Sequence, residues 1–319
     1  MAGQMIKQST RVVADIGGTN ARFAFVKNSS DELLGIEKFP CADFPLFVDA
    51  VRAYMDRGHV ENVDQICLAI AGPVEDDLID LPNNHWVFSR RELEVALGVS
   101  VHIINDFSAQ VLSIGSIRDE ELRWIGLGRP DYSAPGVIAV LGPGTGLGVS
   151  AMLSSGEIIP SEAGHIGFAP QDGHESALLN ELWHRYERVS VERLLSGMGL
   201  ANLYWANGRL DGLEKELSAP GITAGALAGD RLCLKAVKDF CAILGSVAGD
   251  VALMMGANSG VYLSGGILPL MQELIDEDLL RQRFNAKGRF SEICSRIPLG
   301  IVMAEHPGLR GCVRALRSL

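Results

Sequence analysis

The sequence lacks the features that mark several large classes of protein. It has no lysine- and arginine-rich run, and 28 basic against 39 acidic side chains give a net charge of −11. Nucleic acids and anionic membrane surfaces attract basic patches, so we expect neither as a partner. No run of 18 apolar residues occurs, and the first ten residues hold no apolar signal-peptide core. We therefore expect a cytoplasmic protein that is neither exported nor embedded in a membrane.

Cysteine is present but lacks the spacing of a metal site. No Cys-x-x-Cys pair occurs, which argues against bound zinc. Four of the six cysteines lie in apolar or helical-looking segments, as buried free thiols do. The pattern favours reduced thiols in a cytosolic protein. The six are Cys41, Cys67, Cys233, Cys241, Cys294 and Cys312.

The common nucleotide-binding motifs are also missing. No Gly-x-x-x-x-Gly-Lys-Ser/Thr occurs, so a P-loop is not expected. In the glycine-rich segment 142–148, Leu147 occupies the last glycine position of a dinucleotide fingerprint. The residues after Gly18 have the pattern of a strand rather than a helix, which also argues against a dinucleotide site. A bound nucleotide would need another kind of loop.

Two glycine-rich turns between apolar segments are the most informative features present. The first, Asp15 to Thr19, lies between strand-like segments, and the second runs from Gly142 to Gly148. Glycine reaches positive φ and has no Cβ, so phosphate oxygens can approach the backbone N–H groups closely. One Gly-Gly turn is typical of an ordinary hairpin. Two such turns favour a phosphate clamp, in which Asp15 could hold hydrated Mg²⁺ and Thr19 could donate a hydrogen bond.

The pattern of elements predicts an α/β protein with two domains, for which 319 residues suffice. Three strands, then alternating helices and strands, indicate a mixed sheet covered by helices in the first hundred residues. A pair of strands around the second turn and long helices from 174 to about 256 indicate a second domain. We expect a small α/β domain of residues 1–107 plus about 300–319, and a large α/β domain of residues 108–299. The expected strands are 11–17, 21–27, 33–40, 64–71, 99–104, 137–141, 149–153, 261–267 and 299–304, and the expected helices include 43–57, one beginning at Ser89, 231–255 and 308–319.

Three glycine elements follow one another along the chain, the third being Ser264-Gly265-Gly266. Their order resembles the superfamily of sugar kinases, heat-shock 70 proteins and actin, whose two phosphate hairpins and adenosine loop clamp ATP between two domains. Within it, the segments 103–107 (Ile-Ile-Asn-Asp-Phe), 162–165 (Glu-Ala-Gly-His) and 191–197 (Val-Glu-Arg-Leu-Leu-Ser-Gly) resemble the bacterial glucokinase family. The resemblance extends from Val12 to the C-terminal segment. It implies a two-domain actin-like ATPase (ribonuclease H-like) fold with an interdomain cleft.

The resemblance also implies a role for individual residues. Asp106 would be the catalytic base, and Asp15 would hold Mg²⁺ through water. The residues that would bind glucose are Asn83, Asn105, Asp106, Glu162, His165 and Glu192. The residues that would bind ATP are Ala14, Asp15, Ile16, Gly17, Gly18, Thr19, Gly142, Gly144, Thr145, Gly146, Gly265 and Gly266. The family further implies a homodimer.

The chemistry of sugar phosphorylation supports these roles independently. Carboxylates and a neutral imidazole nitrogen accept hydrogen bonds from sugar hydroxyls, and bonds to charged groups are the stronger kind. A primary hydroxyl is a poor nucleophile, so a carboxylate must be placed to accept its proton during phosphoryl transfer. Asp106 follows the strand-like segment 99–104. It therefore lies where α/β proteins place their ligands.

The same residues also have structural interpretations. Asp106 alone is typical of a helix N-cap, and Glu192 is typical of a first-turn residue favoured by the helix dipole. Glu162 and His165 lie in a glycine-rich, apolar segment, where a charged group is costly unless it is paired or used. There the functional interpretation is favoured. Pro143 departs from the small residue expected in the second turn, and its fixed φ affects the geometry of the turn more than its function.

The sequence predicts ATP-dependent phosphorylation of glucose at the 6-hydroxyl, which gives glucose 6-phosphate and ADP and starts glycolysis. One alternative is a related hexose or N-acetylhexosamine kinase, but that group carries a cysteine-rich zinc motif that residues 162–231 lack. Another is a non-catalytic sugar-sensing regulator, for which the residues before Val12 are too few to form a helix-turn-helix. A third is an actin-like assembly ATPase, which would not need the polar residues at 105, 106, 162 and 165.

Overall fold

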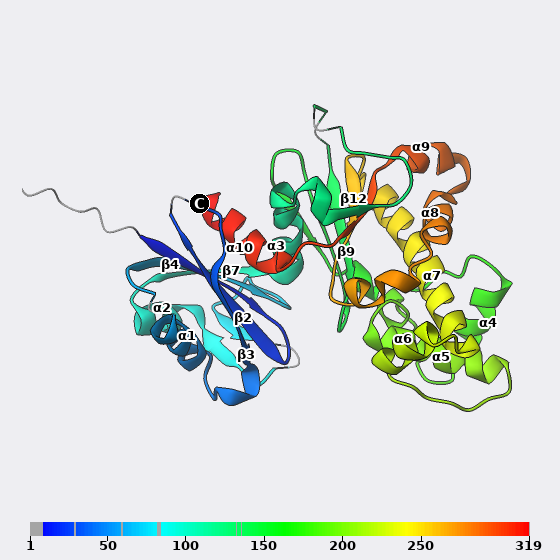
Figure 1. The fold of residues 1–319 in the computed structure, drawn as a ribbon, viewed down its shortest axis with the longest axis horizontal. Coiled ribbons are helices and arrows are strands. Elements are labelled where there is room, and N and C mark those ends of the chain that lie inside the picture. The colour runs from blue at the N-terminus through cyan, green and yellow to red at the C-terminus, as the bar shows by residue number, and fades with distance from the viewer. Residues whose placement is uncertain are drawn as a thin grey trace, which may run out of the picture. The chain divides into compact units, whose positions relative to one another are not determined.

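A computed structural model describes residues 9–28, 30–58, 60–81, 84–131, 133–134 and 136–318. The chain divides into two compact units (Figure 1). Unit 1 comprises Met1–Ile117 and Ala304–Leu319, and unit 2 comprises Arg118–Met303. Each unit contains a β-sheet and helices packed against it, so the expected α/β class is confirmed. The expected domain boundaries remain a prediction.

The sheet of unit 1 has five strands in the order β3-β2-β1-β4-β7. The first three strands are antiparallel neighbours, whereas β1, β4 and β7 run parallel. Ile16, Ile70 and Asn105 lie in register across the parallel strands, so these strands end at one edge of the sheet. The strands are β1 (Thr10–Ile16), β2 (Asn20–Lys27), β3 (Leu34–Pro40), β4 (Val63–Ile70) and β7 (Ser100–Asn105).

Helices cover both faces of this sheet because its strands are apolar on both sides. Along β1, Val12 and Ala14 pack in one core with helix α1, and Val13 packs in another core with residues of α3 and α10. This is the period of two expected of a strand. Figure 1 shows α10 beside the N-terminal strands. The elements are α1 (Phe47–Arg57), α2 (Arg90–Leu97), α3 (Asp106–Ser113), α10 (Pro307–Arg317), the hairpin β5 (Leu78–Asp80) and β6 (Val87–Ser89), and the turns η1 (Cys41–Asp43) and η2 (Ile114–Ser116).

The sheet of unit 2 has six strands in the order β11-β10-β9-β12-β13-β8. Strands β9 and β10 form the hairpin that carries the second glycine turn. Strand β12 runs parallel to both β9 and β13. The strands are β8 (Leu122–Trp124), β9 (Ile138–Pro143), β10 (Leu147–Met152), β11 (Ile158–Ser161), β12 (Gly260–Leu263) and β13 (Leu299–Val302).

The long helix α7 (Arg231–Met255) organises the helices of unit 2. It matches the predicted helix at both ends, is buried on most faces, and packs against α5, α6 and α8. Gly256 ends it in the left-handed conformation with φ 63°, a common helix terminator. The other elements are α4 (Gly173–Leu182), α5 (Gly197–Leu210), α6 (Ala219–Leu227), α8 (Glu277–Asn285), α9 (Ser291–Arg296), and the turns η3 (Asp119–Glu121), η4 (Ala163–His165), η5 (Val191–Arg193), η6 (Leu268–Leu274) and η7 (Gly288–Phe290).

Local expectations differ from the structure mainly at element ends. The predicted helix 43–57 begins only at Phe47, after the 3₁₀ turn η1. Ser89 caps α2 by accepting a hydrogen bond from the backbone N–H of Glu92 at 3.2 Å, as the sequence predicted. All six cysteines are free and buried. Among the helices of the described chain, none is long and apolar enough to cross a membrane.

Candidate active site

The first glycine turn joins β1 to β2 and is held by hydrogen bonds of its own backbone. The Gly17 N–H donates to the Asn20 carbonyl at 3.0 Å, and the side-chain amide of Asn84 donates to the Gly17 carbonyl at 3.2 Å. The Cys41 N–H donates to the Thr19 carbonyl at 2.9 Å. Residues Gly17 to Thr19 are nevertheless exposed. The turn therefore presents a fixed backbone that a phosphate chain can approach.

The expectation that this turn uses positive φ is wrong. The described glycines with positive φ do not include Gly17 or Gly18. The hairpin turns without left-handed backbone, and the value of glycine here is the missing Cβ. In unit 2, Gly265 does have positive φ, at 111°.

Asp15 is the last residue but one of β1 and lies beside the first turn of α10. Burial raises the pKa of its carboxyl above the usual value, and the nearby Arg22 and His306 side chains oppose that shift. The Arg22 guanidinium lies 4.0 Å from Oδ2. A methyl group on Gly308 would lie 2.9 Å from Cγ of Asp15, so any side chain there would have to displace the carboxylate or the helix.

Asp15 is the one acidic group expected to hold magnesium. Within the described residues, no group of three or more His, Cys, Asp or Glu side chains could hold a metal ion. Mg²⁺ retains several waters and often binds through one or two carboxylates together with substrate phosphates. A single carboxylate beside a phosphate-binding turn fits that chemistry.

Asn105 and Asp106 occupy the junction between β7 and α3. Asn105 is the N-cap, because its Oδ1 accepts from the backbone N–H groups of Phe107 at 2.9 Å and Ser108 at 3.1 Å. Its amide also donates to the Gly72 carbonyl at 3.4 Å. Asp106 is the first helical residue, and its Oδ1 accepts from the Phe107 N–H at 2.9 Å. The N-cap interpretation thus belongs to Asn105, and the Asp106 carboxylate lies at the positive end of the α3 dipole.

In unit 2, Glu192 joins η5 to the second glycine turn. Its Oε2 accepts from the Leu147 N–H at 2.9 Å, and a methyl group on Gly146 would lie 2.5 Å from the same oxygen. The Gly144 carbonyl accepts from the Gly197 N–H at 2.9 Å, at the start of α5. The hairpin turn, the Glu192 carboxylate and the α5 N-terminus therefore form one cluster.

His165 ends the turn η4 and Glu162 precedes it as the N-cap, and this turn packs on the same hairpin. A methyl group on Gly164 would lie 2.0 Å from the Leu147 carbonyl oxygen, so this contact requires glycine. Nδ1 of His165 lies 4.0 Å from Oε1 of Glu192. Glu162 and His165 are both exposed, with 59% of the His165 side chain accessible. The argument that an apolar environment forces a use for their charge is therefore wrong, and the position near Glu192 supports a role for His165 alone.

Gly265 follows β12 and contacts the same hairpin, whereas a methyl group on Gly266 would have no neighbour within 4 Å. A methyl group on Gly265 would lie 2.5 Å from the Pro143 carbonyl oxygen, and that oxygen accepts from the Ile267 N–H at 3.4 Å. Pro143 itself is the last residue of β9 and pairs with Leu147. It therefore extends the strand and leaves the turn to the residues that follow.

The structure gathers the predicted residues into two groups. Unit 1 carries Asp15 to Thr19, Asn105 and Asp106, and unit 2 carries the second turn, Glu162, His165, Glu192 and Gly265. Asn83 lies outside the described residues. Sequence reasoning missed Asn84, whose only signal was its place beside Asn83. It also missed Gly308, although two glycines three residues apart in a predicted helix could have indicated a close contact.

The whole chain is similar to proteins of one family. A sequence model of the family described as Glucokinase matches residues 12–319. Glucokinase of Chromohalobacter salexigens is 42% identical over 313 residues, which cover 96% of this chain and 97% of that protein. The crystal structure of glucokinase from an Antarctic psychrotroph has a TM-score of 0.87 at 34% identity, covering 98% of this chain and 99% of that one. A ROK family glucokinase from Streptomyces griseus, in complex with glucose and AMPPNP, shares the fold with a TM-score of 0.66 at 17% identity, covering 98% of this chain and all of that one.

Proposed function

This chain belongs to the glucokinase family, and we propose that it transfers the γ-phosphoryl group of ATP to the 6-hydroxyl of glucose with Asp106 as the base. The fold is the two-domain actin-like fold of its structural neighbours. Glucose and ATP are its substrates, and glucose 6-phosphate and ADP are its products. The roles of individual residues are part of the proposal.

The placement of Asp106 carries the proposal. Strands β1, β4 and β7 end in register, so the turn after Ile16 and the helix after Asn105 begin at one edge of the sheet of unit 1. Ligands of open α/β sheets bind at the carboxyl ends of parallel strands. A phosphate-binding turn and a carboxylate fixed at a helix N-terminus therefore share the edge where this chemistry is expected.

The reaction needs one proton acceptor and a fixed geometry. The Asp106 carboxylate accepts the proton of the glucose 6-hydroxyl as O6 bonds to the γ-phosphorus. The bond from that phosphorus to the bridging oxygen breaks, and ADP leaves with the electron pair. Phosphoryl transfer is accelerated mainly by positioning and by neutralising charge. The Phe107 N–H and the Asn105 cap hold the Asp106 carboxylate in place for this step.

Backbone groups and Asp15 handle the charge of ATP. The Gly17 and Gly144 N–H groups are bonded within their own turns, so the N–H groups of Gly18, Thr145 and Gly146 would face the phosphates. Gly17 and Gly144 would leave room for the phosphate oxygens because they lack Cβ. Thr19 adds a hydroxyl donor. Mg²⁺, held by Asp15 through water, would neutralise negative charge on the phosphates.

Glu162, His165, Glu192 and Asn105 bind the glucose hydroxyls. Oε2 of Glu192 is committed to the Leu147 N–H, whereas Oε1 lies 4.0 Å from Nδ1 of His165. That separation is too long for a direct hydrogen bond. A sugar hydroxyl bonded to both atoms would explain why the two side chains are held near each other without touching.

Two properties follow from the family alone. We infer a homodimer. Sedimentation of the purified protein at several concentrations tests this inference, and the mass of a monomer at every concentration would contradict it. We infer a cytoplasmic location, where ATP is available to the enzyme. Fractionation of cells that produce the protein tests the second inference.

Sugar-stimulated ADP formation by the wild type and by Asp106→Asn tests the function. The wild type should turn over ATP with glucose and much less with fructose, mannose or N-acetylglucosamine. Asp106→Asn should lose about 10²–10⁴-fold in kcat, with glucose affinity by calorimetry nearly unchanged because the amide still forms hydrogen bonds. A preference for another sugar would identify a different hexose kinase, and near-native kcat in Asp106→Asn would remove the base assignment.

A further inference from the structure

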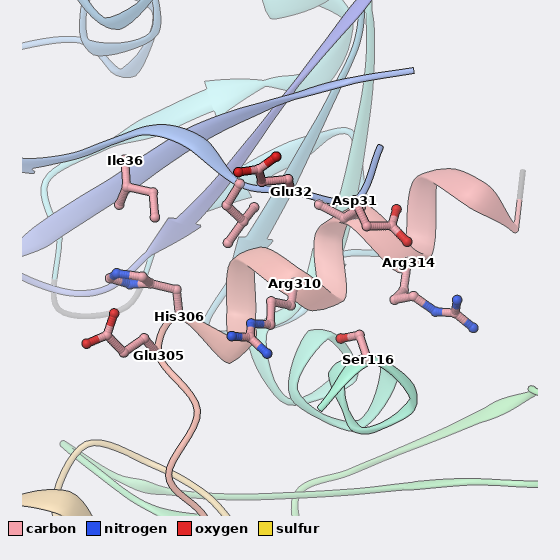
Figure 2. A pocket seen from close by; sticks show the side chains of 10 residues that line it. Asp31, Glu32, Ile36, Ser116, Glu305, His306, Arg310 and Arg314 are labelled. Atoms are coloured by element: carbon pink, nitrogen blue, oxygen red, sulfur yellow. The ribbon is translucent and has the colours of Figure 1, made fainter. Parts of the chain in front are cut away.

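The C-terminal helix α10 contacts two elements that carry the reacting groups of unit 1. Its apolar face packs on the sheet and on α3 through Leu309, Cys312 and Val313. Figure 2 shows its other side, where Arg310 and Arg314 line a cavity together with Ser116. The volume of this cavity is about 350 Å³. The cavity mixes basic and acidic side chains and points to no single ligand. The packed face is the informative one.

Gly311 brings α10 into contact with the backbone of α3. A methyl group at this position would lie 1.9 Å from the carbonyl oxygen of Ala109 and 2.4 Å from its carbonyl carbon. The obstacle is backbone, so no side-chain rotation can relieve it. Ala109 lies in the first turn of α3, which begins at Asp106. Any side chain at Gly311 must therefore displace the turn that carries the base.

Gly308 makes the corresponding contact with β1, one turn earlier on the same face of α10. A methyl group there would lie 2.9 Å from Cγ and 3.0 Å from Oδ2 of Asp15. The Cys312 thiol lies 3.6 Å from the Ala14 carbonyl oxygen, which fixes the helix against the same strand. The helix thus has glycine where it approaches the Asp15 carboxylate and where it approaches the first turn of α3.

The backbone before α10 is itself unusual. His306 precedes the helix with φ 54° and ψ 48°, a left-handed conformation that non-glycine residues rarely adopt. Among the described residues, Asn62 is the other non-glycine with positive φ. Residues held in such conformations persist only where the surrounding structure fixes them. The turn at His306 directs the first residues of α10 onto Asp15.

We propose that Gly308 and Gly311 are positioning residues, through which α10 sets the places of Asp15 and of the first turn of α3. Three residues of helix separate the two contacts, about 4.5 Å along the axis. The same rigid helix therefore fixes the positions of Asp15 and of the first turn of α3 relative to each other. The proposal rests on the roles proposed above for Asp15 and Asp106. It assigns a function in catalysis to a helix that carries none of the reacting groups.

Gly311→Ala and Gly308→Ala test it, with Gly115→Ala as the matched control. A methyl group on Gly115, in the turn η2 that follows α3, would lie 3.8 Å from an Arg314 nitrogen, an ordinary contact. Gly311→Ala should lower kcat by about a hundredfold, the cost of misplacing a reacting group by about an ångström, while glucose affinity by calorimetry stays within about twofold. Gly308→Ala should raise the Mg²⁺ and ATP concentrations needed for half-maximal rate by about tenfold. The control should match the wild type.

A double-mutant cycle separates positioning from general destabilisation. If Gly311 acts through Asp106, adding Gly311→Ala to Asp106→Asn should cost little further kcat, because residues acting as a unit are non-additive. If the losses of kcat in the two single variants multiply in the double variant, the proposal is wrong. Wild-type kinetics in both glycine variants would also overturn it. So would a parallel loss of glucose affinity, ATP affinity and kcat, which would indicate general destabilisation. If Gly311→Ala does not fold, Gly308→Ala with its Mg²⁺ titration decides. Near-native kcat in Asp106→Asn would instead refute the proposed base. The positioning role of α10 would then be tested by Gly308→Ala alone.

Discussion

Replacing Glu192 separates its structural role from its proposed sugar contact. Its Oε2 accepts from the Leu147 N–H at 2.9 Å, and 22% of its side chain is exposed. Glu192→Ala leaves that N–H of the second glycine turn without its partner, which costs about 1–3 kcal/mol of stability. Glu192→Gln keeps an acceptor of the same size for Leu147. It loses only the charge, so its stability should fall by less than about 1 kcal/mol.

The kinetics of the two variants should differ in the same way. A lost charged hydrogen bond to a glucose hydroxyl is worth about 1.5–3 kcal/mol, or roughly tenfold to a hundredfold in kcat/KM for glucose. Glu192→Gln should show this loss with KM for ATP unchanged. Glu192→Ala should also raise KM for ATP, because the turn between Gly144 and Leu147 loses its anchor.

Urea unfolding and steady-state kinetics with each substrate varied are the assays for both variants. Replacement of Ser176, an exposed residue on α4, by alanine provides a surface control for handling and expression. If Glu192→Gln keeps glucose kcat/KM within twofold of wild type while Glu192→Ala is destabilised, Glu192 only supports the turn. The assignment of Glu192 to the sugar would then be refuted.

Three further predictions concern other parts of the chain. Gly18→Val should abolish measurable ATP binding in calorimetry and leave glucose binding intact, because the turn is exposed and needs no positive φ; equal loss of both ligands would indicate misfolding. His306→Gly should be about 1 kcal/mol more stable to urea than His306→Ala, because only glycine adopts the left-handed backbone without strain; equal stability would show that the turn relaxes. The pKa of Asp172 is held below its usual range, mainly by the hydrogen bond from the Glu175 N–H and to a smaller extent by the Arg283 side chain, although desolvation acts in the opposite direction. Its stabilisation is full above the usual carboxyl pKa and is lost as pH falls through the lowered native pKa, so Asp172→Asn should flatten the acid side of the pH–stability curve; an unchanged slope would exclude Asp172 as a source of acid lability.

Much of the fold could be predicted from the sequence because it depends on local order. Apolar periodicity located α7 at Arg231–Met255, and the Ser89 cap located the start of α2. The two glycine turns between apolar strands identified both hairpins. These features need only neighbours along the chain, whose geometry follows from helix and strand periods. The resemblance of short motifs then pointed to the family.

The contacts that build the candidate site were decided only by the tertiary structure. The Glu192 bond to Leu147 joins residues 45 positions apart, and the contact of Gly308 with Asp15 joins opposite ends of the chain. Sequence spacing does not encode such distances, because they depend on how whole elements pack. For the same reason, the apolar neighbours of Glu162 and His165 in sequence did not make these side chains buried, since burial depends on what covers a segment. The sequence determined which residues could take part, and the packing of α10, η4 and η5 on the two hairpins decided which of them meet.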